Sequence, residues 1–143
     1  MTWMALALAA ALALPADAVT VVVGATLVDG GGRAPVTDSI VVVRGTVVAA
    51  VGDRMRTPIP KGASLVDGRR MWIAPVAAES AAGPALVTAI ATILRGPTAR
   101  VLAGQPAHLA LLEGDPRRDT PAAAVKRLWI AGQARDVTAG GGR

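Results

Sequence analysis

Two valine-rich runs constrain the fold of this chain more than any other feature. The first reads VTVVVGATLV at residues 19–28 and the second reads IVVVRGTVVAAV at residues 40–51. Valine and isoleucine fit the pleated surface of a β-strand. Aromatic residues make up only 2% of the chain, and Phe and Tyr are absent. The core must therefore be built from Val, Ala, Leu and Ile, which favours strands.

Further short apolar runs, separated by glycine and proline, predict a mainly β domain. The segment ALVTAIATIL at 85–94 predicts one short helix that stops at Gly96-Pro97. The strands predicted after the second valine-rich run cover residues 64–67, 71–76 and 108–112, followed by a strand pair that bends at Gly132. This pattern of about seven short strands with one or two short helices is typical of a small β-sandwich or an open β-barrel.

The N-terminal sequence MTWMALALAAALALPADA, residues 1–18, predicts a cleaved export signal. Its apolar run, 4–14, is followed by the small–x–small pattern Ala16-Asp17-Ala18. The run is shorter than the ~20 residues that span a bilayer, so we expect no stable membrane anchor. No Lys or Arg precedes the run, so an uncleaved Ala/Leu helix stays an alternative. We expect a periplasmic or secreted protein with one domain at 19–137 and a disordered tail at 138–143.

Charge and cysteine content exclude several classes of function. The net charge of +5 comes mostly from arginines that stand singly or in pairs, with no basic run of five or more. Such scattered charge indicates a solvated surface, so we expect no nucleic-acid partner. The chain has no cysteine, which excludes disulfides, thiol catalysis and cysteine-based zinc sites.

Five motifs in this order resemble the metal-dependent amidohydrolase superfamily, in the branch with imidazolonepropionase-like and prolidase-like members. They are VVGATLVDGGG (22–32), DSIVVVRGTVVAAVG (38–52), PIPKGASLVDGRRMWIAP (58–75), AGQPAHLALLEGDPRRD (103–119) and VKRLWIAGQARD (125–136). In that superfamily the N- and C-terminal segments pair into a small composite β-sandwich. The sandwich flanks a TIM-type barrel that carries the metal site. The resemblance therefore implies an amidohydrolase-like β-sandwich over 19–137, with a short helical insert near 84–95.

The same resemblance implies that the barrel and its metal ligands are missing. Members of the superfamily continue from the W-I-x-P strand into a glycine and a metal-binding His-x-His pair. Here WIAP at 72–75 is followed by VAAES, which contains no histidine. The N-terminal match ends near Pro75 and the C-terminal part begins by about Pro84, which leaves no room for a barrel of ~250 residues. We therefore predict a truncated chain without a TIM barrel.

No catalytic, cofactor-binding or metal-binding residue is predicted. His108 is the only histidine, and a catalytic zinc site needs about three protein ligands, so we interpret His108 as structural or surface. Glu79 and Ser80 lie where the active site would begin, but no base or oxyanion hole is evident, so both are read as loop residues. Lys61 and Lys126, the only lysines, do not match the metal-bridging lysine of the superfamily and are expected to face solvent.

Four further residues are interpreted structurally. Asp29 and Asp67 match turn positions and are expected to cap those turns through their side chains. Trp72 and Trp129 each lie in an apolar strand and are expected in the core of the sandwich.

Three functions stay open at this point. The first is a non-catalytic remnant of a metal-dependent hydrolase acting on carbon–nitrogen (non-peptide) bonds. The second is an active carbon–nitrogen hydrolase, which the resemblance alone would imply, so the sequence leaves enzymatic activity uncertain. The third is an exported interaction module that binds an unknown protein or itself, since loss of a barrel would expose an apolar face of the sandwich. A gene fragment that folds poorly would have the same sequence features as the first.

Overall fold

The described part of the chain is mainly β, as predicted, and it contains one of the one or two short helices that were expected. The computed structural model describes residues 18–81, 83, 85–97, 99–117 and 124–135. The predicted signal, apart from Ala18, and the predicted tail lie outside the described residues. The elements are β1 (Val19–Leu27), β2 (Val36–Arg44), β3 (Val47–Asp53), β4 (Ser64–Asp67), β5 (Trp72–Pro75), α2 (Ala85–Arg95), β6 (Leu109–Leu112), β7 (Val125–Ile130) and β8 (Gln133–Arg135).

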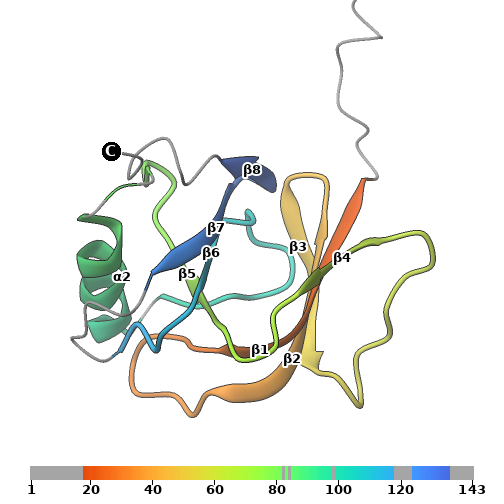
Figure 1. Ribbon diagram of the computed structural model, residues 1–143, viewed down its shortest axis with the longest axis horizontal. Coiled ribbons are helices and arrows are strands. Elements are labelled where there is room, and N and C mark those ends of the chain that lie inside the picture. Colours follow the sequence, from red (N-terminus) through yellow and green to blue (C-terminus); the bar gives the residue numbers. More distant parts are fainter. Residues whose placement is uncertain (1–17, 82, 84, 98, 118–123, 136–143) are drawn as a thin grey trace, which may run out of the picture.

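Hydrogen bonds join the eight strands of the described chain into one sheet (Figure 1). The strand order is β3-β2-β1-β5-β6-β7-β8, and β4 pairs with β1 outside this path. β1 is central: it runs antiparallel to β2, and parallel to β4 along its first part and to β5 at its end. The N- and C-terminal parts of the chain meet where β5 pairs antiparallel with β6. The predicted small β domain is thus confirmed, and its strands form one continuous bent sheet.

The valine-rich run at 40–51, predicted as one β run, is divided between two strands. β2 ends at Arg44 and β3 begins at Val47, and the two pair as an antiparallel hairpin. Gly45 between them has φ 61, in the left-handed region that glycine adopts without steric cost. Because both halves of the run are rich in valine, its composition concealed the reversal of the chain.

One hydrophobic cluster lies inside the bend of the sheet. Alternate residues of each strand point to this side, so distant strands contribute to the same cluster. Its buried members are Val22, Ala25, Leu27, Val41, Val43, Val48, Ile73, Val101, Ala107, Leu109, Leu111 and Trp129. Trp129 is 3% exposed, which confirms its predicted place in the core. Because β3 and β7 lie far apart in the strand order and yet share this cluster, the sheet must curve around it.

Helix α2 covers the opposite face of β5, β6 and β7. Leu86, Ile90 and Leu94 recur every fourth residue, so they form one apolar stripe, and all three are buried. They belong to a second cluster that includes Ala110 of β6, and the half-buried Trp72 packs against it. Figure 1 shows the helix beside these strands, away from the β2–β3 hairpin. Within the described residues, no helix has the length and apolar character needed to cross a bilayer.

Three turns are hydrogen-bonded to one another and hold the bend closed. The Ala107 N–H donates to the Thr46 carbonyl in the β2–β3 turn at 2.9 Å, and the Gly132 N–H in the β7–β8 turn donates to the Ala107 carbonyl at 3.0 Å. The Val48 N–H of β3 also donates to the Gln105 carbonyl, at 2.9 Å. The loop before β6 therefore links one edge of the sheet to the turn near the other edge.

Candidate functional site

The segment after β5 forms a turn held by backbone hydrogen bonds. The Val76 N–H donates to the His108 carbonyl at 3.0 Å, and the Ser80 N–H donates to the Ala77 carbonyl at 3.0 Å. Glu79 is exposed and Ser80 is half-buried. Both residues thus belong to a surface turn, in agreement with the loop interpretation. Nowhere in the described part of the chain do three His, Cys, Asp or Glu residues gather closely enough to hold a metal ion.

His108 supports the β7–β8 turn. Its Nδ1 accepts a hydrogen bond from the Ala131 N–H at 2.9 Å. Ala131 has φ 51, a left-handed conformation that is uncommon for a residue other than glycine. The bond requires a lone pair on Nδ1, so neutral His108 carries its proton on Nε2. The structure therefore confirms a structural role for this histidine.

The two aspartates predicted as turn caps, Asp67 and Asp29, differ in the location of their hydrogen-bond partners. Asp67 accepts a hydrogen bond from the Arg69 N–H at 3.0 Å, which closes a local turn as predicted. Asp29 instead accepts from the Val101 N–H at 2.8 Å, and its other oxygen lies 3.8 Å from Arg100 Nε. The prediction of a local cap was wrong for Asp29, because its partner lies in the segment that follows α2.

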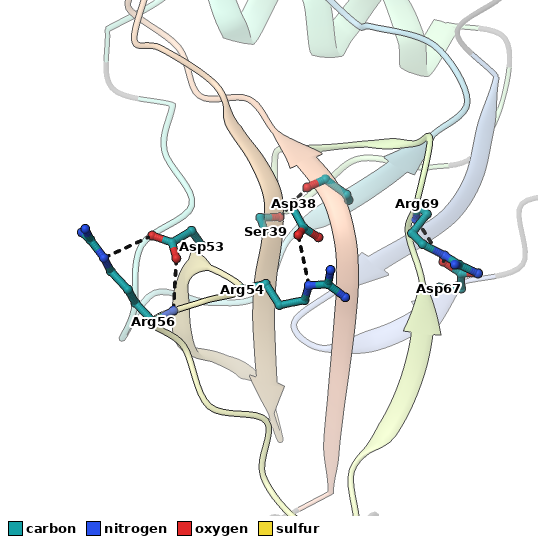
Figure 2. Close-up of polar contacts among 8 residues, drawn as sticks. Asp38, Ser39, Asp53, Arg54, Arg56, Asp67 and Arg69 are labelled. Atoms are coloured by element: carbon teal, nitrogen blue, oxygen red, sulfur yellow. Dashed lines mark hydrogen bonds and ion pairs between the residues drawn. The ribbon is translucent and has the colours of Figure 1, made fainter.

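Several carboxylates of the β1–β4 region form surface ion pairs (Figure 2). Asp38 contacts Arg54 at 3.0 Å, and Asp67 contacts Arg69 at 3.0 Å, with all four side chains at least half exposed. Hydrogen bonds from the Arg69 side chain and backbone lower the pKa of Asp67 from 3.8 to about 2. Exposed pairs of this kind contribute little to stability, because water and salt screen the charges. These ion pairs therefore lie on the protein surface.

A cleft of about 370 Å³ lies between α2 and the loop after β1, and we name it the arginine cleft. Its wall contains apolar side chains of α2 together with polar side chains from three separate segments. The polar lining residues are Asp29, Arg33, Thr88, Thr92, Arg95 and Arg117. Sequence analysis missed this cleft, because its three arginines lie far apart in the chain and no local pattern connects them.

A second cleft, of about 450 Å³, lies between β4 and the β7–β8 pair, and we name it the β4 cleft. Its lining includes the apolar Leu65 and Met71, the acidic Asp67, and the basic Lys126, Arg127 and Arg135. Leu65 is 62% exposed although it is apolar. Lys126 is exposed, as is Lys61, which agrees with the prediction for the two lysines.

Comparison with known proteins places similar structures among the amidohydrolases. Phenylurea hydrolase B is 40% identical over 41% of this chain, with a TM-score of 0.38. Molinate hydrolase is 26% identical over 43% of this chain, also with a TM-score of 0.38. A prolidase is 22% identical over 52% of this chain, with a TM-score of 0.35. The matches span 13%, 13% and 19% of those chains, respectively, so this chain covers less than a fifth of their length. No family model matches the sequence, and no curated protein does.

Proposed function

We propose that this chain is an exported, non-catalytic β domain that retains the sandwich segments of an amidohydrolase-like protein without the catalytic barrel. The pairing of β5 with β6 supports this proposal most directly. Ala74 lies opposite Ala110 in that pair, so the W-I-x-P strand and the C-terminal motif are direct neighbours in the sheet. Only residues 76–108 connect them, and their described part holds a single helix, α2. A (β/α)₈ barrel takes ~250 residues.

The chemistry of the side chains supports the same proposal. The chain has one histidine and no cysteine. The histidine already uses Nδ1 to hold the Ala131 N–H. A catalytic zinc ion takes about three protein ligands, with nitrogen and sulfur donors prominent among them. A metal centre built mainly on nitrogen and sulfur donors would need more histidines or cysteines than this sequence contains.

The test is metal content and hydrolysis measured together. The full chain would be expressed in medium supplemented with zinc and manganese, purified without chelators and analysed for metals. Phenylurea hydrolase B prepared in the same way is the control. We expect well below about 0.1 metal ion per chain and no hydrolysis of phenylurea or dipeptide substrates above background. One to two tightly bound ions per chain, with hydrolysis that chelation removes, would contradict the proposal.

The β4 cleft favours a second candidate, an interaction module that associates with another copy or with a protein partner. Within the described chain, β4 pairs only with β1, so its other edge is open. Leu65 on this strand is largely exposed, and open edges with apolar side chains promote association. Light scattering of the full chain against Leu65→Lys tests this candidate. A concentration-dependent dimer that the variant abolishes would support it, whereas two monomeric proteins would exclude self-association through β4.

A further inference from the structure

The arginine cleft brings together cationic groups that the sequence keeps apart. Arg33 follows β1, Arg95 ends α2, and Arg117 follows β6, and all three line the same cleft. Asp29 is the one acidic residue among the lining residues. Its carboxylate is already engaged by the Val101 N–H and by Arg100. The lining residues therefore carry more positive than negative charge.

Two of the three guanidinium groups are fixed in place. One nitrogen of Arg33, NH1, donates to the carbonyls of Gly30 at 2.7 Å and Pro97 at 3.0 Å. Arg117 forms a two-bond pair with Asp115, at 3.0 and 2.7 Å. The other nitrogens of Arg33 can still donate, because a guanidinium has five N–H groups in a planar fork. A fixed cation loses less side-chain entropy when it binds a ligand, so these groups are suited to recognition.

Arg95 supplies the cation that is still available. It is exposed, and within the described chain its guanidinium has no hydrogen-bond or ion-pair partner. A free guanidinium beside a positively charged cleft binds an oxyanion by two parallel hydrogen bonds, which is the geometry that carboxylates prefer. The Thr88 hydroxyl lies on the same helix, one turn from Thr92, and both line the cleft.

The remainder of the wall is apolar. Val87, Ala91 and Leu94 of α2 line the cleft beside the arginines. The volume of about 370 Å³ falls in the range of small-ligand sites. A ligand that pairs with the arginines and also packs against the apolar residues of α2 has one anionic end and a short apolar body. The carboxylate of Asp29 disfavours a doubly charged phosphate more than a singly charged carboxylate.

We infer that the arginine cleft binds a small organic carboxylate with an aliphatic tail. The carboxylate group pairs with Arg95 and Arg33, and the tail lies along α2. This inference is independent of whether the chain hydrolyses any substrate, because binding is measured without turnover. A chain that proved catalytic would leave it intact.

The experiment is an amide NMR titration of the ¹⁵N-labelled full chain at low salt with hexanoate, hexan-1-ol and inorganic phosphate. We expect saturable shifts with hexanoate at Gly32, Arg33, Thr88 and Thr92, with a dissociation constant on the order of 1 mM. Hexan-1-ol should bind at least about tenfold more weakly, because it lacks the charge. Phosphate that binds more tightly than hexanoate would overturn the carboxylate assignment.

Two variants, each lacking one positive charge, distinguish a direct contact between Arg95 and the carboxylate from attraction by the net charge of the protein. Arg95→Gln should weaken hexanoate binding about tenfold. Arg56→Gln changes a side chain that is 88% exposed and does not line the cleft, so it should change affinity by less than about twofold. Unchanged amide spectra away from the substitution confirm that each variant folds. Equal weakening by the two variants, or no saturable shift in the parent chain, would overturn the inference.

Discussion

The backbone of Gly132 in the β7–β8 turn lies directly against the carbonyl group of Gly45 in the β2–β3 turn. A Cβ placed on Gly132 would overlap the Gly45 carbonyl oxygen and would come within 3.1 Å of the Thr46 Cα. Gly132 also has φ 77, in the left-handed region. The two turns can therefore approach this closely only because position 132 carries no side chain.

Gly132→Ala should destabilise the protein by about 3 kcal/mol or more, because it adds a steric overlap to an unfavourable φ. Gly62→Ala is the matched control. Gly62 has φ 78, but nothing lies within 4 Å of the Cβ it would gain, so only the backbone term of about 1–2 kcal/mol applies. Urea unfolding of both variants measures the difference. Equal losses would show that the turns separate without cost.

Ser39→Ala should lower the free energy of unfolding by about 1–2 kcal/mol. Ser39 is fully buried on β2, and its hydroxyl donates to the Ala25 carbonyl at 2.8 Å, beside an irregularity in the β1–β2 register. Removal of the hydroxyl leaves a buried acceptor with one partner fewer. Thr37→Ala removes an exposed hydroxyl from the same strand and should change stability by less than about 0.5 kcal/mol. Thermal unfolding of the two variants decides the matter.

Asp29→Ala should cost about 1.5–3 kcal/mol, and Asp29→Asn should cost clearly less. The alanine variant loses the charge-assisted acceptor for the Val101 N–H, whereas asparagine keeps an oxygen at that position and loses only the charge near Arg100. Chemical unfolding of both variants gives the two values. Equal costs would assign the stabilisation to the charge rather than to the hydrogen bond with Val101.

The side-chain carboxyl of Asp67 should titrate near pH 2 in the folded chain. Its pKa is lower than the ordinary value of 3.8 because Arg69 donates hydrogen bonds to the ionised form. The contribution to stability is therefore complete above about pH 4 and is lost as the pH falls towards 2. The effect is small and salt-dependent, since the pair is exposed. Carboxyl NMR should show the midpoint rising in Arg69→Gln and staying unchanged in Arg54→Gln. A midpoint of 3.8 in the parent chain would refute this.

The sequence predicted strands well where apolar runs were bounded by glycine or proline. The strand at 64–67 has the predicted limits, and the helix predicted at 85–94 is longer by one residue, Arg95. The β2–β3 hairpin was missed, because Arg44 and Gly45 interrupt a run that is valine-rich on both sides. Composition alone does not show where the chain reverses within such a run.

The clefts could not be predicted, because they depend on contacts between distant segments. Asp29 was assigned to its own turn, since a sequence shows near neighbours and not Val101. Arg33 and Arg95 each follow an ordinary local signal, a glycine-rich turn and a helix end. Only the packing of α2 against the sheet brings them to one cleft. By contrast, the sequence itself shows that no histidine pair follows Pro75.

The central position of β1 has a consequence for how this polypeptide acquires its fold. β1 leaves the ribosome first among the strands, yet it is complete only when β4 and β5 have joined it, and the bend closes only when Gly132 reaches the β2–β3 turn. Pairings between such distant segments form slowly, since the entropy of closing long loops opposes them. Nearly the whole chain must be synthesised before the native sheet can form. The native sheet is therefore completed only after the residues around Gly132 have left the ribosome, when the β7–β8 turn can bond to the loop before β6.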